Sequence, residues 1–323
     1  MRPRLSGVKQ AGRSAAWPGR GRVGYVYEVG VWAKEALSVS AGDGRVLEVV
    51  VAGPPDGMPL IFHHGTPGAA GPFDALVEAG AERNVRHIAY SRPGYSGSDR
   101  HKGRSVASCV TDVAAIADAL GYDRFYSSGG SGGGPHSIAC AALIPHRVIA
   151  AAAISTPAPL DAHGLDWTAG MGSENKEEYR LAQAGERELR EYLDREASAV
   201  NGASADELLL VWNELFCEPD RRALNGTYAE HTIRQFERSL AAGIWGWFDD
   251  DLALVSDWGF ELDDVGAPLS IWHGAQDHFI PLSHGEWLAA HIPGAKARLR
   301  AGDGHISLTL SSYGDVLDAL IEG

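Results

Sequence analysis

The sequence predicts an α/β fold in which helices flank a mostly parallel sheet and a helical segment interrupts the pattern. In the first half of the 323-residue chain, short β-branched or aromatic runs alternate with Ala-rich amphipathic stretches, which is typical of parallel strands joined by helices. Residues 157–262 contain charged amphipathic stretches and no convincing strand, and the alternation resumes at Pro268. We therefore expect a core of residues 31–156 and 263–323 and a helical cap of residues 157–262.

The individual elements follow from periodicity and turn residues. Gly42, Asp43 and Gly44 predict a hairpin turn, Gly121 a helix end, and Pro135 a first helical turn. The expected strands are 37–41, 45–52, 58–64, 86–91, 124–130, 147–155, 268–273 and 295–301. The expected helices are 73–82, 105–120, 132–143, 174–199, 205–216, 227–242, 244–258, 283–291 and 308–321. Residues 1–30 begin with a basic stretch rich in Gly, Pro and Ser that lacks the apolar run of a signal peptide, so we expect a disordered tail.

Composition excludes several classes of partner. The formal charge of −14 disfavours binding to nucleic acid or to an anionic membrane, and no apolar run is long enough to span a bilayer. The three cysteines show no paired spacing and predict a reducing compartment, so we expect a cytoplasmic protein. The expected partner is a small-molecule substrate. The oligomeric state is not predicted.

Ser131 is the candidate nucleophile, in the stretch Gly129-Gly130-Ser131-Gly132-Gly133. Glycine makes up 40 of 323 residues, so a Gly-x-Ser-x-Gly match is weak evidence for a nucleophile on its own. Whether Ser131 is a nucleophile therefore has to be judged from the strand and helix expected around it. A predicted strand ends before the serine and a predicted helix follows it. At such a turn the serine takes a strained backbone conformation, and side chains two positions away on either side would clash. No Lys-Ser/Thr follows, so the spacing does not fit a Walker loop.

A serine hydroxyl needs a base, and the base needs an acid that orients it. We predict His305 as the base because it lies between the last strand and the last helix, at the carboxyl edge of the sheet where the Ser131 turn also emerges. We predict Asp277 as the acid because it follows strand 268–273 at the same edge. Asp303 is nearer to His305 in sequence, but a carboxylate only two residues away on the same loop is poorly placed to hydrogen-bond the imidazole ring. Four other histidines compete with the predicted base: His64, His136, His278 and His291.

The tetrahedral intermediate of acyl transfer needs two hydrogen-bond donors for its oxyanion. One should be the backbone N–H of Gly132, directly after the nucleophile. The second should come from the loop 64–68, His-Gly-Thr-Pro-Gly, where we choose the N–H of Thr66.

Together these pieces resemble the α/β-hydrolase superfamily. The matched pieces are loop 64–68, the turn 92–97 (Arg-Pro-Gly-Tyr-Ser-Gly), Ser131, Asp277 and His305, and the resemblance covers about residues 36–323. It implies the α/β-hydrolase fold with a mostly parallel eight-stranded sheet and no cofactor. The order Ser, Asp, His along the chain is that of hydrolases with this kind of turn.

Two departures from related patterns bear on the reaction. Members that open epoxides or carbon–halogen bonds carry Asp at the turn, so Ser131 favours acyl transfer. We therefore expect a serine esterase that acts on a carboxylic ester, or a related acyl bond, of a small hydrophobic substrate. Loop 64–68 is also similar to the His-Gly-Gly-Pro-Gly loop of prolyl aminopeptidase-like members, with Thr in place of one Gly.

Other functions stay open at this point. An aminopeptidase needs cap carboxylates for a free amine; Glu174, Glu177 and Glu178 are available, although their pattern is that of a solvated helix face. Some members of such folds bind ligands without catalysis, and lyases and cofactor-free oxidative members share the triad.

The substrate pocket should lie under the cap. Its candidate residues are His64, Trp167, Met171, Trp245, Trp247 and Phe248, although the five apolar ones also suit core packing. Neither His63 with His64 nor Asp161 with His163 has a third ligand at a suitable spacing, and the Gly runs lack the acid of a dinucleotide site. We expect no metal and no cofactor.

Overall fold

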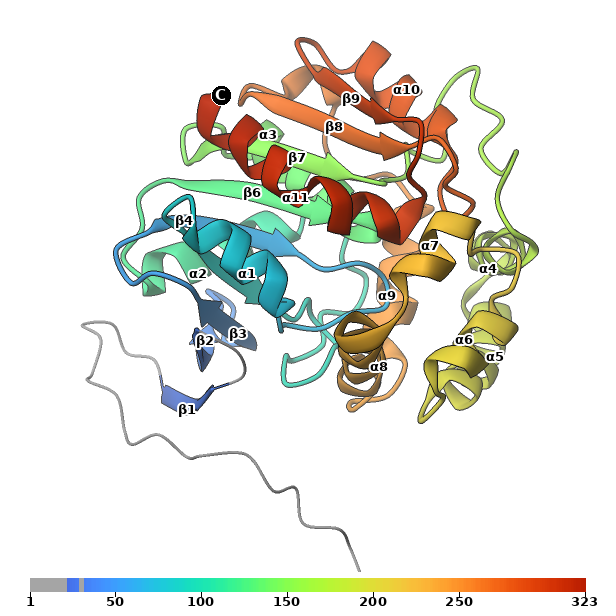
Figure 1. Cartoon of the computed structure of the whole chain (residues 1–323), viewed down its shortest axis with the longest axis horizontal. Coiled ribbons are helices and arrows are strands. Elements are labelled where there is room, and N and C mark those ends of the chain that lie inside the picture. Colours follow the sequence, from blue (N-terminus) through green and yellow to red (C-terminus); the bar gives the residue numbers. More distant parts are fainter. Residues whose placement is uncertain (1–21, 29–31) are drawn as a thin grey trace, which may run out of the picture.

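A nine-stranded sheet forms the centre of the computed structural model, which describes residues 22–28 and 32–323 (Figure 1). The strand order is β1-β2-β3-β5-β4-β6-β7-β8-β9. Strands β4 to β9 run parallel to one another, and β1, β2 and β3 join the edge at β5 by antiparallel pairing. The strands are β1 Arg22–Glu28, β2 Ala33–Ser40, β3 Val46–Ala52, β4 Met58–His63, β5 Val85–Tyr90, β6 Phe125–Gly130, β7 Val148–Ile154, β8 Leu269–Gly274 and β9 Lys296–Arg300.

The sheet has one strand more than the eight that the resemblance implied. The additional strand, β1, pairs with β2 within the range 1–30 where we expected a disordered tail, so that expectation is wrong for residues 22–28. Its sequence, Arg-Val-Gly-Tyr-Val-Tyr-Glu, is rich in the β-branched and aromatic residues that favour strands. The rest of the expected tail, residues 1–21 and 29–30, lies outside the described residues.

Helices cover both faces of the sheet. One buried apolar cluster joins the sheet to α2, α3 and α10, and another joins it to α1 and α11, which lie in front of the sheet in Figure 1. Because both faces are covered, every residue of β5 and of β8 is buried, as expected for the inner strands of a parallel sheet. These helices are α1 Asp74–Ala81, α2 Cys109–Ala119, α3 Gly134–Leu143, α10 Leu282–His291 and α11 His305–Glu322.

Six helices lie between β7 and β8, and residues 157–262 are called the helical segment below. The helices are α4 Ser173–Ala184, α5 Glu186–Val200, α6 Ala205–Val211, α7 Glu218–Ala223, α8 Gly226–Ser239 and α9 Trp245–Leu254. The single helix expected over 174–199 is two helices, because Gly185 at φ +141° ends α4. Helix α7 was not expected. The segment has its own apolar cluster, in which Leu189, Leu193 and Trp247 pack with Tyr95 of the core.

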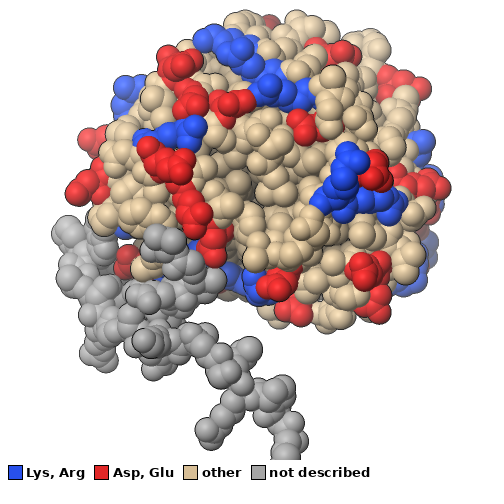
Figure 2. Space-filling model, viewed as in Figure 1, with Lys and Arg blue, Asp and Glu red and all other residues tan. Residues whose placement is uncertain are grey.

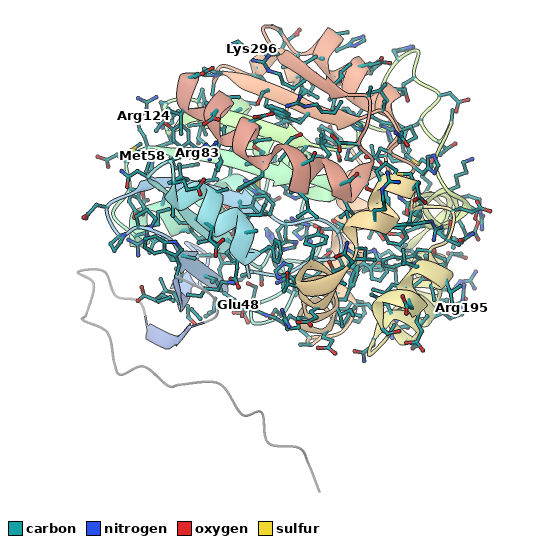
Figure 3. The ribbon with its side chains drawn as sticks, in the orientation of Figure 1. Glu48, Met58, Arg83, Arg124, Arg195 and Lys296 are labelled. Atoms are coloured by element: carbon teal, nitrogen blue, oxygen red, sulfur yellow. The ribbon has the colours of Figure 1, made fainter. Side chains whose placement is uncertain are left out.

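The helical segment faces the carboxyl ends of the parallel strands. Met58 at the start of β4 and Arg124 just before β6 lie on the opposite side of the molecule from Arg195 of α5 (Figure 3). Near α8, Glu48 of β3 forms an ion pair of 2.8 Å with Arg238. This arrangement places the loops after β4, β6 and β8 beneath the segment. None of the helices in the described part of the chain is long and apolar enough to cross a membrane.

Candidate active site

Ser131 lies in a tight turn between β6 and α3. Its φ is +53°, a strained conformation for a residue other than glycine. A Cβ atom added at Gly129 would lie 2.1 Å from the carbonyl oxygen of Gly133, and one added at Gly133 would lie 2.2 Å from the carbonyl oxygen of His63. Both distances are far inside van der Waals contact, so only glycine fits at these two positions. The strained serine and the two obligatory glycines agree with the expectation from the sequence.

The structure pairs His305 with Asp277. His305 is the first residue of α11, and its Nδ1 lies 2.7 Å from Asp277 Oδ2. Asp277 Oδ1 accepts the backbone N–H groups of Phe279 and Ile280, each at 2.9 Å, so the carboxylate is held in one orientation. The Phe279 ring stacks on the His305 ring with centroids 4.5 Å apart, a contact that the sequence did not indicate.

The Asp277 carboxylate also raises the pKa of His305. Burial alone would lower the pKa of His305, but the negative charge and the hydrogen bond of Asp277 outweigh it, and the pKa is raised above the ordinary value of 6.5. The competitors His64 and His136 have pKa values far below the ordinary one because both are buried. His64 Nδ1 contacts the carbonyl oxygen of Gly65 and His136 Nδ1 that of Gly132, so both rings are engaged with the backbone.

Two cavities meet at Ser131 and His305. One, of about 230 Å³, lies between the sheet, α1, α8 and α11, and its walls include Phe62, Phe73 and Leu76. This part of the molecule faces the viewer in Figure 2, where uncharged residues cover the centre of the face. The other cavity, of about 180 Å³, lies under the helical segment and is called the inner cavity below. Ser131 and His305 line both cavities, so the two side chains share one site.

The residues expected to stabilise an oxyanion lie beside Ser131. Thr66 and Gly132 both line the inner cavity with Ser131. A Cβ atom added at Gly132 would lie 2.3 Å from Thr66 Oγ1, and one added at Gly65 would lie 3.5 Å from Ser131 Cβ. The loop after β4 therefore passes directly over the turn that carries the serine.

A buried ion pair between Arg92 and Asp250 holds this loop in place through hydrogen bonds. Arg92 Nη2 donates to the carbonyl oxygen of Gly65 at 3.0 Å and lies 2.5 Å from Asp250 Oδ2. Thr66 Oγ1 donates to the same carboxylate oxygen at 2.8 Å, and Arg104 contacts Asp250 Oδ1 at 2.7 Å. Burial alone would raise the pKa of Asp250, but the two guanidinium charges hold it well below its ordinary value. Asp250 belongs to α9, so the helical segment helps to position the loop of the site.

Replacing Asp250 with asparagine should lower the free energy of unfolding by about 3–5 kcal/mol, because Arg92 and Arg104 would remain buried without their counter-charge. Urea unfolding followed by circular dichroism measures this loss. The neighbouring variant Asp249→Asn is the control, since its partner Arg100 is partly exposed and exposed pairs contribute little. Equal losses in the two variants would contradict a special role for Asp250.

A second carboxylate of the helical segment contacts the backbone of His305. Asp220 of α7 is fully buried and accepts the backbone N–H groups of His305, Ile306 and Ser307 at 3.0, 2.9 and 2.8 Å. These are orphan donors of the first turn of α11, where a negative charge is also favoured by the helix dipole. This contact could not be predicted from the sequence, because α7 is only six residues long and was not expected as a helix.

The expected pocket residues are only partly at the site. His64 lines the larger cavity and Trp247 the inner one, whereas Trp167, Met171, Trp245 and Phe248 line neither. Trp167 and Met171 pack in a separate cluster, where Trp167 Nε1 donates to the carbonyl oxygen of Ala158. The Trp245 ring stacks under the Arg100 guanidinium at 4.0 Å, and Phe248 packs against Trp245. These four residues pack in the core or at the surface and do not line either cavity. Packing was the alternative role that their apolar side chains also suited.

The carboxylates of α4 differ in position. Glu174 and Glu178 line the inner cavity, whereas Glu177 is exposed and forms an ion pair with Arg180. Only Glu177 therefore lies on the solvated face that we expected for all three. Within residues 22–28 and 32–323, no group of three or more His, Cys, Asp or Glu side chains is placed to hold a metal ion.

The chain is similar to several known proteins. It is 25% identical over 285 residues to the non-heme chloroperoxidase of Streptomyces lividans, which covers 87% of this chain and 96% of that protein. It is 26% identical over 252 residues to the pimeloyl-[acyl-carrier protein] methyl ester esterase of Nitrosomonas europaea, covering 77% of this chain and 89% of the relative. The crystal structure of the enol-lactonase from Burkholderia xenovorans LB400 has the same fold, with a TM-score of 0.65 at 18% identity over 88% of this chain and 100% of that one. The family described as "alpha/beta hydrolase fold" matches residues 58–310, most of the sequence, and the chain belongs to this family.

Proposed function

We propose that the protein is a serine hydrolase that cleaves a carboxylic ester, or a related acyl bond, of a small hydrophobic substrate. The observation that carries this proposal is the Asp277–His305 hydrogen bond of 2.7 Å in a site shared with Ser131 on its strained turn. The esterase named among the relatives supports the same reaction class.

The first step is acylation of the serine. His305 Nε2 takes the proton from Ser131 Oγ while the oxygen attacks the carbonyl carbon of the substrate. Asp277 holds the ring so that Nδ1 carries its proton and Nε2 is free to accept one, and it stabilises the imidazolium that forms. His305 then protonates the leaving alcohol, and an acyl-enzyme remains on Ser131. A water molecule, deprotonated by His305, hydrolyses the acyl-enzyme by the same steps.

The negative charge of each tetrahedral intermediate develops on the former carbonyl oxygen. The backbone N–H groups of Gly132 and Thr66 are the proposed donors for it, since both residues adjoin the nucleophile in the inner cavity. The Arg92–Asp250 pair fixes the loop that carries Thr66, so the donors are held in place before the charge appears. The helical segment acts as the cap of the site, because α4, α6, α8 and α9 all contribute residues to the walls of the inner cavity.

A panel of nitrophenyl esters and aminoacyl anilides tests the reaction class. We expect fast release of nitrophenol from esters with short apolar acyl groups and slow turnover of the anilides, because the larger cavity is walled mainly by apolar side chains. A fluorophosphonate probe should label the protein once, and mass spectrometry should locate the label on Ser131.

The same panel identifies the alternatives. Fast cleavage of anilides with slow ester turnover would indicate that the protein is an aminopeptidase and not an esterase. A protein that binds ligands but reacts with neither the substrates nor the probe would be a non-catalytic member of the fold.

A further inference from the structure

A pair of carboxyl groups lies in the wall of the inner cavity. Glu178 of α4 and Asp251 of α9 are in hydrogen-bond contact with each other, and both line this cavity together with Ser131 and His305. Glu178 Oε1 also accepts the indole N–H of Trp247 at 2.8 Å. Two carboxylates cannot hydrogen-bond without a proton between them, so the pair shares a proton.

Asp251 is buried in the wall without a donor from an N–H or alcohol group of the protein. The residue is 1% exposed, and no such group among the described residues donates to its Oδ2. A carboxylate at this burial costs free energy unless a proton or a bound group supplies a donor. Asp251 lines the inner cavity, so a group bound there can supply the missing donor.

The charges around the pair are mainly negative. Arg92 and Arg104 are both paired with Asp250, which leaves one guanidinium charge to set against Glu178 and Asp251. Glu174 in the same wall and Glu196 beside Glu178 add further carboxylates, and no Lys or Arg lines the inner cavity. The shared proton removes one of these negative charges, and a bound cation would offset one in the same way.

Aromatic side chains enclose the carboxyl groups. The rings of Tyr179, Trp212, Phe216, Phe236 and Trp247 all line the inner cavity. The faces of such rings attract organic cations, and carboxylates add charge-assisted hydrogen bonds to an ammonium group. A cavity of about 180 Å³ admits a group slightly larger than benzene, which fits an engineered cavity of about 150 Å³.

We propose that Glu178 and Asp251 bind a primary ammonium group, so that the natural substrate carries a small amine-bearing half in the inner cavity and an apolar half in the larger one. This inference rests on the proposed function, since it names the class of substrate that Ser131 attacks. The inference identifies the ammonium group that the cavity binds, and it holds whether the bond that Ser131 attacks is an ester or an amide.

The titration of the pair agrees with this assignment. Burial raises the pKa of Glu178 to about 7, with a further upward contribution from the charge of Glu196. Burial and the negative charges of Glu178 and Asp250 raise the pKa of Asp251 well above its ordinary value, against the smaller opposing effect of Arg104. The pair therefore keeps a proton near neutral pH until a cation replaces it.

The test compares two isosteric substrates. Nitrophenyl 3-aminopropanoate and nitrophenyl butanoate differ by an ammonium group in place of a methyl group, and they release the same chromophore. We expect kcat/KM to favour the amine-bearing ester by tenfold or more, the effect of one charge-assisted hydrogen bond. Glu178→Gln and Asp251→Asn should each reduce this ratio by about tenfold. Glu177→Gln, on the exposed side of the same helix, is the matched control and should leave the ratio unchanged.

Inhibition of the unmodified protein provides a second measurement that needs no variant. n-Butylammonium should inhibit butanoate hydrolysis competitively and at least tenfold more strongly than n-butanol, whichever half of the substrate carries the amine. The ammonium site would be overturned, and the esterase left intact, by the following result: butanoate is hydrolysed, n-butylammonium and n-butanol inhibit equally, and the amine-bearing ester is not preferred. If neither ester is hydrolysed, the proposed function fails, and an increase in Tm with n-butylammonium but not with n-butanol would still support the site.

Discussion

Replacing Ser131 with alanine is expected to lower kcat/KM for a nitrophenyl ester by about 10⁴-fold or more, since the acyl-enzyme has no other oxygen on which to form. The turn itself should persist, because its geometry depends on Gly129 and Gly133 rather than on the serine hydroxyl. Steady-state hydrolysis measures the loss, and labelling by a fluorophosphonate should disappear with it.

The matched control for this variant is Ser128→Ala. Ser128 lies three residues earlier in β6, is fully buried, and its Oγ has no hydrogen-bond partner among the described residues, so its removal should leave both stability and activity near those of the unmodified protein. A Ser131→Ala protein that retains full activity would exclude the covalent mechanism. A small residual rate is expected, because oxyanion stabilisation and substrate binding remain.

The placement of the candidate site residues in the core could be predicted from the sequence because it depends on local order along the chain. A strand before Ser131, a helix after it, and Asp277 and His305 each following a later strand place all three residues at one edge of a parallel sheet. The Ser131 turn, the Asp277–His305 pair and the loop 64–68 are found where that order predicts. The extra strand β1 was missed because its short run of Val and Tyr follows a Gly- and Pro-rich stretch that is typical of a tail.

The contribution of the helical segment could not be predicted in the same way. Asp220 lies 85 residues from His305 and Asp250 lies 158 residues from Arg92, and helical periodicity does not say which core loop a helix will meet. The run Asp249-Asp250-Asp251 was only the densest acidic stretch of the sequence, yet its members pair with Arg100, with Arg92 and Arg104, and with Glu178. Three adjacent carboxylates on a helix point in different directions, so each meets a different partner. The signal available in the sequence was their position in an apolar stretch, Trp-Gly-Trp-Phe before and Leu-Ala-Leu after, which is unusual for a solvated run.

Replacing Asp277 with asparagine should lower kcat/KM by about 10⁴-fold, as the equivalent change does in a serine protease. Asp277 Oδ1 accepts two backbone N–H groups, so the asparagine oxygen should stay at that position and its NH₂ group should face His305 Nδ1. Nδ1 then has to accept a hydrogen bond, and the ring proton moves to Nε2. In that tautomer His305 cannot take the proton from Ser131.

The pH dependence separates this explanation from a general loss of structure. Asp277 raises the pKa of His305, and the base is active only when neutral, so the acid limb of kcat/KM in the unmodified protein should lie above pH 6.5. In Asp277→Asn the negative charge is absent while burial still disfavours the imidazolium, so the limb should move to lower pH. Asp303→Asn, the carboxylate nearer in sequence, should change neither the rate nor the limb by more than a few fold. A larger effect at Asp303 than at Asp277 would mean that the histidine is oriented from its own loop, and the assignment of the acid would be wrong.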